Sequence, residues 1–245
     1  MKKVRLDQLL VERGIAESRE KAKRLILAGQ IIVEKHPAPK PGLMLAADHE
    51  MVLKEPERFV SRGGEKLEGA MKAFPISLDG TVCLDIGSST GGFTDCMLQH
   101  GASKVYAIDV GKGQLHWKLR EDPRVVVMEG VNARYLTPED LPEAADFASI
   151  DTSFISLTRI LPAVKSLLKP DGEIVSLIKP QFEAGKEEVD KGRGVIIDPA
   201  IHEAVISKVW KFGTEELGLD WLGLETSPIK GPKGNIEFLA YWKRP

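Results

Sequence analysis

A glycine-rich stretch between a predicted strand and a predicted helix is the first place in this sequence where a small ligand could bind. The stretch reads Asp85-Ile86-Gly87-Ser88-Ser89-Thr90-Gly91-Gly92-Phe93. Glycines let the backbone approach a ligand closely, and the free amides at the start of a helix attract polar or charged groups. Asp109 ends the next predicted strand, where a carboxylate can accept both hydroxyls of an adenosine ribose. The pattern predicts a ligand that contains a nucleoside.

Two ligands fit this pattern, a nicotinamide dinucleotide and S-adenosylmethionine. The full GxGxxG spacing of a phosphate-binding turn is missing, because Ser88 and Ser89 follow the first glycine and Asp85 precedes it. A carboxylate repels a pyrophosphate and tolerates a cationic methionine. The residues therefore favour S-adenosylmethionine as the cofactor. Asn132, which follows a later strand, either meets the adenine edge or forms a turn.

Further polar residues are predicted at the ends of later strands, where open sheets of this kind bind ligands. Asp151 ends one predicted strand and Lys179 ends the next. Pro180 disfavours helical geometry at Lys179, so this lysine should stay extended. Glu237 is expected within the last strand among apolar neighbours, where a carboxylate needs a partner.

Strands that alternate with helices predict a parallel sheet covered on both faces after residue 80. The short connection before the last strand makes that strand antiparallel to its neighbour. The sequence therefore predicts an α/β, Rossmann-like sheet with an antiparallel last strand. The expected strands are 82–86, 104–109, 124–128, 146–151, 173–179, 221–226 and 236–241, and the expected helices are 93–100, 156–168 and 199–217.

The first sixty residues are basic and predict a separate small α+β unit. They contain twelve Lys or Arg against nine Asp or Glu, whereas the remainder of the chain is acidic. One helix is expected to end at Gly14, a second begins at Ser18, and strands over 31–33 and 51–53 form a hairpin. A basic helix can be a solvated face or can bind phosphates. The candidate RNA-binding residues are Arg5, Arg19, Lys23 and Arg24.

The order of these elements resembles the alpha-L type RNA-binding module that several RNA-modifying enzymes share. Lys66, Asp151, Lys179 and Glu237 together resemble the Lys-Asp-Lys-Glu tetrad of the FtsJ-like RNA 2′-O-methyltransferases. With both parts present, nearly the whole chain resembles the TlyA family, historically labelled hemolysins. The resemblance implies an RNA-binding domain over 1–58, a linker over 59–64 and an S-adenosylmethionine-dependent methyltransferase domain over 65–245.

The resemblance further implies 2′-O-methylation of ribosomal RNA, with a cytidine of large-subunit rRNA as the expected target and rRNA or ribosomal subunits as partners. The shorter form of the family, which this chain matches by stopping at Pro245, is the one linked with the large subunit alone. We hypothesise that Lys179 faces the hydroxyl and takes its proton, while Lys66, Asp151 and Glu237 orient and tune it. Burial and a second cation favour the neutral lysine that this role needs, and the carboxylates oppose it.

Each tetrad residue also has a purely structural interpretation. Lys66 could lie on a helix surface, Lys179 could be a solvated strand-end cation, and Asp151 could cap a helix. The remaining alternatives for the whole chain are a non-catalytic RNA-binding or ribosome-assembly factor and an RNA base N-methyltransferase. The second is weakened because Asp151-Thr152-Ser153-Phe154 lacks the prolines of the usual motif.

Several functions are excluded by residues that the sequence lacks. Carbon methylation through a covalent adduct needs a cysteine after Cys96, and none occurs. Two cysteines outside a CxxC pair exclude a thiolate metal site, so no metal is expected. No long apolar run supports export, membrane spanning or pore formation, which predicts a cytoplasmic protein. The sequence gives no oligomeric state.

Overall fold

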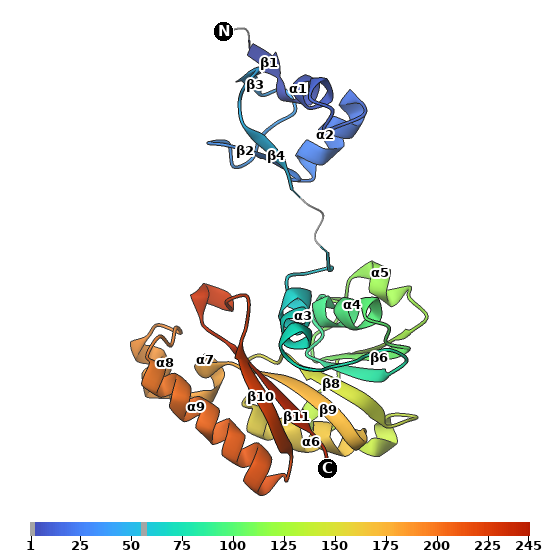
Figure 1. The fold of residues 1–245 in the computed structure, drawn as a ribbon, viewed down its shortest axis with the longest axis vertical. Helices are drawn as coiled ribbons and strands as arrows, with labels where there is room; N and C mark the ends of the chain where they lie inside the picture. The colour runs from blue at the N-terminus through green and yellow to red at the C-terminus, as the bar shows by residue number, and fades with distance from the viewer. Residues whose placement is uncertain (1–2, 55–57) are drawn as a thin grey trace. The chain divides into compact units, whose positions relative to one another are not determined.

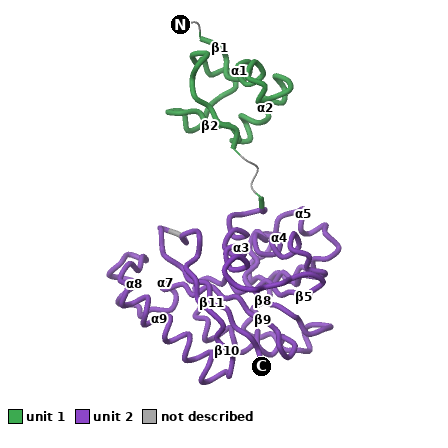
Figure 2. Tube along the Cα trace, in the orientation of Figure 1, with its two compact units in different colours: residues 1–58 green, residues 59–245 purple. Residues whose placement is uncertain are grey.

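The computed structural model describes residues 3–54 and 58–245, and the chain forms two compact units, residues 1–58 and 59–245 (Figure 2). The segment 59–64, which we expected to be a linker, lies inside the second unit. Phe59 is buried there, and its ring occupies the space that a side chain on Gly64 would need. Val60 donates its backbone N–H to Asp95 Oδ2 at 2.9 Å. This segment is therefore packed against the second unit.

The described part of the first unit contains two helices and two short antiparallel strand pairs. Ser18 caps the second helix by accepting the N–H of Lys21, as its residue type predicts. The two predicted strands, over 31–33 and 51–53, pair with each other. A second strand pair was not expected, and one of its strands lies between the two predicted strands in the sequence. The elements are β1 (Lys3–Arg5), α1 (Leu6–Glu12), α2 (Arg19–Leu27), β2 (Ile31–Val33), β3 (Met44–Ala46) and β4 (Met51–Leu53), with β1 paired to β3 and β2 to β4.

The described part of the second unit is built on a seven-stranded sheet with the order β10-β11-β9-β8-β5-β6-β7 (Figure 1). The pairs among β5 to β9 are parallel, whereas β11 is antiparallel to both β9 and β10. The α/β fold with an antiparallel last strand is thereby confirmed. The strands are β5 (Val82–Ile86), β6 (Lys104–Asp109), β7 (Val125–Glu129), β8 (Ala145–Ile150), β9 (Leu168–Ile178), β10 (Asp220–Thr226) and β11 (Phe238–Lys243).

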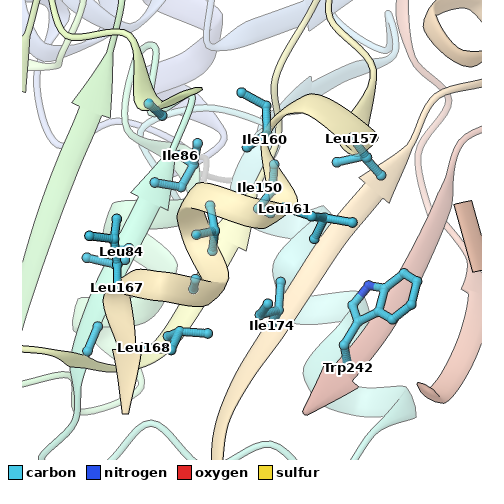
Figure 3. Packing of buried hydrophobic residues seen from close by; sticks show 14 of the residues in the cluster. Leu84, Ile86, Ile150, Leu157, Ile160, Leu161, Leu167, Leu168, Ile174 and Trp242 are labelled. Carbon is cyan, nitrogen blue, oxygen red and sulfur yellow. The ribbon is translucent and has the colours of Figure 1, made fainter. Parts of the chain in front are cut away.

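Helices cover both faces of this sheet. Successive side chains of a strand point to opposite faces, and because the apolar ones occur on both faces, each face needs a covering layer. On β5, Cys83 joins the core under α3 and α4, and Leu84 joins the core under α6 and α9. Figure 3 shows the second of these cores, with Leu161 and Leu167 of α6 packed on the sheet beside Ile150. The helices are α3 (Gly63–Ala73), α4 (Gly92–Gln99), α5 (Trp117–Arg120), α6 (Leu161–Leu167), α7 (Pro180–Glu183), α8 (Lys186–Lys191) and α9 (Pro199–Lys211).

Two predicted helices are shorter than expected. The helix over 156–168 is divided into a 3₁₀ turn, η3 (Leu157–Arg159), and α6, whose first turn holds a proline that lacks a backbone N–H. The helix over 199–217 is α-helical only to Lys211 and continues as the π-helical turn η4 (Phe212–Glu216). Gly213 in that turn lies against the ring of Trp242, where a side chain would collide. The remaining 3₁₀ turns are η1 (Ala133–Tyr135), η2 (Pro138–Asp140) and η5 (Pro232–Gly234).

Across residues 3–54 and 58–245, none of the helices combines the length and the apolar character needed to cross a bilayer.

Candidate active site

A cavity of about 360 Å³ opens beside the carboxyl ends of the parallel strands, where the sequence predicts a ligand site. Five expected site residues are in its wall: Gly87, Ser89, Asp109, Asn132 and Asp151. The remaining lining residues are Ile86, Val110, Gln114, Val131, Ala133, Thr152, Ser153, Ile155 and Ile160. The wall therefore combines apolar side chains with a few polar groups, as binding sites for small molecules do.

Gly87 makes the turn after β5 possible. Its φ is 86°, a left-handed conformation that favours glycine, and an added Cβ would lie 2.6 Å from the carbonyl oxygen of Asp151. The turn after β5 can therefore lie directly against the end of β8, with no side chain between them. This close approach puts the cavity next to Asp151.

Asp109 fixes the rim of the cavity through both oxygens of its carboxylate. Oδ2 accepts the backbone N–H of Ser89 at 2.8 Å, and Oδ1 accepts that of Gly111 at 2.7 Å. Each carboxylate oxygen still has acceptor capacity for a ligand hydroxyl. Asn132 lines the cavity and also forms a local turn, since its Oδ1 accepts the N–H of Arg134 at 3.1 Å. Both of the roles considered for Asn132 are compatible with this position.

Asp85 differs from the expectation of direct ligand contact. Its carboxylate is completely buried on the α4 face of the sheet, where Oδ2 accepts the N–H of Thr94 at 2.9 Å and its hydroxyl at 2.6 Å. Ser149 Oγ lies 3.3 Å from Oδ1. Burial raises the pKa of Asp85 to about 7, against the opposing effect of the Thr94 bonds. Alternation along β5 explains the difference, since Asp85 points away from the face of Ile86.

Five further residues of the glycine-rich stretch are also outside the cavity wall, which includes only Ile86, Gly87 and Ser89 of this stretch. Gly91 and Gly92 are close-packing positions, the first against Leu115 and Leu119 and the second against the start of α3. Phe93 belongs to the core beneath α3 and α4. Ser88 is buried, and the carbonyl of Thr90 accepts the N–H of His116. These five residues therefore hold the turn in place through contacts within the protein: Ser88, Thr90, Gly91, Gly92 and Phe93.

Glu129 organises the loop that carries Gln114 to the cavity, and the sequence analysis missed it. Its carboxylate accepts the backbone N–H groups of Gly113, Gln114 and Leu115 and also binds Arg120. These bonds, led by the one from Gly113, lower the pKa of Glu129 to about 2. A glutamate at the end of a predicted strand was a possible signal, but its loop partners are fifteen residues earlier in the chain.

The four residues of the predicted tetrad form one connected cluster next to the cavity. Lys66 Nζ lies 2.7 Å from Glu237 Oε2 and 3.6 Å from Asp151 Oδ2. Lys179 Nζ pairs with the other oxygen of Asp151. Lys66, Lys179 and Glu237 are buried, and one-fifth of the Asp151 side chain is exposed. Asp151 thus joins the two ammonium groups and faces the cavity.

Glu237 immediately precedes β11, so the expectation that it lies within the last strand is wrong by one residue. Its backbone carbonyl accepts the N–H of Ser227 rather than a partner in β9. The side chain meets Gly231, where a Cβ would collide with Oε1, and Gln181 donates Nε2–H to Oε1 at 3.3 Å. Gln181 had not been expected in the site.

Lys179 has two further contacts, a polar one with Ser153 in the loop after β8 and an aromatic one with Phe182 in α7. Ser153 Oγ accepts a hydrogen bond from Lys179 Nζ at 3.4 Å, and Nζ lies 5.8 Å from the centre of the Phe182 ring. Phe154 has a φ of 63° and is 90% exposed, with its ring 5.0 Å from that of Phe182. A large aromatic side chain exposed in a left-handed backbone conformation is unusual and marks a candidate functional position.

In the first unit, two of the four candidate RNA-binding residues are bound to a buried carboxylate. Asp7 is fully buried, and its two oxygens accept hydrogen bonds from Arg5 Nε and Nη2 and from Arg19 Nη2, at 3.0 to 3.2 Å. About half of each arginine side chain remains exposed. Lys23 and Arg24 lie on α2, and Lys23 is exposed on its surface.

Comparisons with known proteins agree with this division of the chain. The FtsJ-like methyltransferase family model matches residues 59–244, and the S4 domain model matches residues 4–50. "Putative rRNA methyltransferase YqxC" of Bacillus subtilis (strain 168) is 53% identical over 242 residues, which are 98% of this chain and 85% of that protein. The "16S/23S rRNA (cytidine-2′-O)-methyltransferase TlyA" of Mycobacterium tuberculosis (strain CDC 1551 / Oshkosh) is 46% identical over 242 residues, 98% of this chain and 90% of the relative.

A solved structure is similar over both units. The structure titled "Putative hemolysin from Streptococcus thermophilus" has a TM-score of 0.76 and 47% identity, and the match covers 100% of this chain and 89% of that one. The matched family models, the full-length relatives and the arrangement of the tetrad agree with one another. The chain therefore belongs to the TlyA (hemolysin A) family, in which an S4 domain precedes an FtsJ-like methyltransferase domain.

Proposed function

We propose that this chain is an S-adenosylmethionine-dependent methyltransferase that modifies the 2′-hydroxyl of a cytidine in ribosomal RNA. The observation that carries the proposal is the position of Asp151 and Ser153. Both line the 360 Å³ cavity, and both contact Lys179 Nζ. A methyl donor in the cavity and a hydroxyl held at Lys179 would therefore both lie next to Asp151 and Ser153, and so close to each other.

The residues of the cavity suit S-adenosylmethionine. Asp109 offers carboxylate oxygens to the ribose hydroxyls, and the apolar side chains of Val110, Val131 and Ile160 can enclose the adenine. Val110 is 69% exposed, although it lines the cavity, and an adenine placed there would cover it. The donor, when bound, supplies a methyl group on a sulfonium, which is electrophilic and needs no activation by the protein.

The tetrad has to orient the attacking hydroxyl and take its proton. Lys179 Nζ is held by two residues of the cavity wall, Asp151 and Ser153, and a ribose hydroxyl placed beside them would contact Nζ. When the methyl group moves from the donor sulfur to this oxygen, the carbon–sulfur bond would break and leave a neutral thioether. The hydroxyl proton would pass to Lys179, which must be neutral to accept it. Lys66 binds the other oxygen of Asp151 and is itself held by Glu237. This arrangement fixes Asp151 and adds a second positive charge near Lys179.

Phe154 offers a surface for the base of the target nucleotide. Its side chain is almost fully exposed, and its ring lies against that of Phe182, whose centre is 5.8 Å from Lys179 Nζ. RNA bases that are unstacked for modification are commonly held on aromatic side chains. A cytosine stacked on Phe154 would bring its own ribose toward Lys179. The first unit would add phosphate contacts through Arg5, Arg19, Lys23 and Arg24.

A Lys179→Ala variant tests the mechanism. Transfer of a tritiated methyl group from S-adenosylmethionine to rRNA should fall by at least ~10²-fold, because both alignment and proton removal are lost. Donor affinity, measured by calorimetry, should stay within threefold, since Lys179 is not part of the cavity wall. Lys186→Ala, an exposed lysine seven residues later, is the matched control and should keep its activity. Unchanged transfer by the Lys179 variant would remove Lys179 from the mechanism.

The subunit that carries the target nucleotide is a separate prediction. We expect the cytidine to lie in large-subunit rRNA, although the name of the Mycobacterium tuberculosis relative includes both 16S and 23S rRNA. Ribose methylation should be mapped on both rRNAs from cells with and without this gene. A modified cytidine that disappears only from the large subunit is the expected result, and loss of one from the small subunit would contradict it.

A further inference from the structure

Glu183 is a buried carboxylate that belongs neither to the tetrad nor to the cavity wall. It ends α7, the single turn that follows Lys179, and its side chain is 1% exposed. Its Oε2 accepts the hydroxyl of Ser156 at 2.5 Å, and its Oε1 accepts the backbone N–H of Leu157 at 2.6 Å. Both donors lie at the far end of the loop that begins after Asp151. The carboxylate therefore joins α7 to that loop.

We propose that Glu183 is a positioning residue for methyl transfer, which holds the 152–156 loop against α7 so that Ser153 and Phe154 stay beside Lys179. The inference rests on the proposed function. The near end of the loop is fixed by the sheet, where the N–H of Asp151 donates to the carbonyl of Ile86 at 2.9 Å. The far end is fixed by the two bonds to Glu183.

The conformation of Phe154 indicates why the far end needs an anchor. A left-handed φ at a residue with a large side chain is strained and persists only where the surroundings enforce it. Ser153 and Phe154 are exposed, so few packing contacts can enforce that conformation. The bonds at Ser156 and Leu157 begin only two residues after Phe154. Releasing them would let the loop relax and move the Phe154 ring away from Phe182.

Lys208 supplies the remaining contacts to Glu183. Its Nζ donates to the carbonyl oxygen of Glu183 at 2.9 Å and lies 3.7 Å from Oε2, and about half of its side chain is exposed. Burial raises the pKa of Glu183 above its usual value, against the opposing bonds from Ser156 and Leu157. An uncharged group of the same shape should therefore fit this position. That makes Glu183→Gln a conservative variant, since it keeps an acceptor for Leu157 and can donate to Ser156.

The experiment compares Glu183→Ala, Glu183→Gln and Lys208→Met in the full chain. Hydrogen–deuterium exchange of the peptide over 152–160 reports the loop without any need for activity. Single-turnover methyl transfer to rRNA, divided by the stoichiometry of donor binding, gives the rate for each folded molecule. We expect faster exchange and at least a tenfold lower rate in Glu183→Ala. Glu183→Gln and Lys208→Met should stay within threefold of the wild-type rate and keep the wild-type exchange.

Ser156→Ala provides a second test if Glu183→Ala does not fold, and it should shift exchange and rate in the same direction by a smaller amount. Wild-type exchange and rate in Glu183→Ala, or a Glu183→Gln variant as impaired as Glu183→Ala, would overturn the inference. A loss of melting temperature with an unchanged rate for each folded molecule would also overturn it, because Glu183 would then be only a structural contact. If the wild-type chain transfers no methyl group to rRNA, the proposed function fails, and exchange alone decides whether Glu183 holds the loop.

Discussion

Single carboxylates with little exposure to solvent hold several of the proposed functional side chains and loops of this protein. Asp7 binds two arginines that face solvent, Glu129 binds three loop amides beside the cavity, and Glu183 binds the far end of the 152–156 loop. A carboxylate can bind several donors at once, which makes it suited to fixing a loop or a pair of cations. The basic or polar groups that we propose as ligand contacts are thus held in place by a carboxylate that is not itself proposed to contact a ligand.

An Asp7→Asn variant distinguishes positioning from simple charge. The substitution removes one negative charge from the first unit, and Coulomb attraction alone would tighten RNA binding. We expect binding to weaken by about three- to tenfold, because Arg5 and Arg19 lose the carboxylate that orders them. The measurement is the dissociation constant for an rRNA fragment at fixed salt, together with the melting temperature of the chain.

Glu20→Gln is the control for this prediction. It makes the same change in charge on an exposed position of α2 that is not bound to either arginine. Its affinity for RNA should be unchanged or slightly higher. Tighter binding by both variants would mean that Asp7 has no positioning role. The pKa of Asp7, which the Arg5 bond lowers to about 2, keeps the carboxylate ionised throughout such measurements.

Asp85 makes the stability of the second unit depend on pH. Its pKa is raised from 3.8 to about 7 in the folded protein, so the folded state favours the protonated form. The contribution of protonated Asp85 to the stability of the folded protein is complete below its unfolded pKa of 3.8, and it is lost as the pH rises through its folded pKa of about 7. Relative to Asp85→Asn, the wild type should therefore lose free energy of unfolding between pH 4 and pH 8, by a few kcal/mol at most. Urea unfolding at pH 4 and pH 8 measures the free energy of unfolding of both proteins. If wild type and Asp85→Asn differ by the same free energy at both pH values, the buried position of Asp85 is contradicted.

At the scale of elements, the approach of α3 to α4 sets the position of Lys66. An added Cβ at Gly92 would lie 2.7 Å from the backbone nitrogen of Gly64 and would also collide with Ser61 Oγ. Gly92→Ala should therefore push α3 and Lys66 away from Glu237. We expect a loss of about 1–3 kcal/mol in stability and a larger fractional loss of methyl transfer than of donor binding. Gly80→Ala, where nothing lies within 4 Å of an added Cβ, should keep the wild-type ratio of transfer to donor binding.

The elements that follow a clear periodicity could be predicted from the sequence, and those that depend on distant partners could not. The strand over 104–109 is found at the expected residues, and the order of the last strands is as expected, because apolar runs and turn residues define them locally. The three-residue strands β1 and β3 are too short to show a pattern. Glu129 and Glu183 were missed because their partners are far along the chain. Asp85 differs from the predicted ligand contact because the alternation along β5 turns its side chain toward Thr94 of α4.

At the scale of the whole molecule, we propose that the second unit binds the donor and the target nucleotide and that the first unit adds phosphate contacts to the RNA. The described cavity is lined only by residues between Ile86 and Ile160, and the second unit has its own two cores. A fragment of residues 58–245 should therefore fold and bind S-adenosylmethionine within threefold of the full chain. Its transfer of methyl groups to rRNA should fall by at least tenfold, because the phosphate contacts of Arg5, Arg19, Lys23 and Arg24 are lost.

The salt dependence of transfer tests this division further. Each phosphate contact contributes to the slope of the logarithm of affinity against the logarithm of salt concentration. The full chain should therefore show a steeper salt dependence than the 58–245 fragment when the Michaelis constant for rRNA is compared at low and high salt. Equal slopes would mean that the first unit makes no phosphate contacts and that the methyltransferase unit alone binds the RNA. A fragment that folds but does not bind the donor would instead show that the first unit contributes to the donor site.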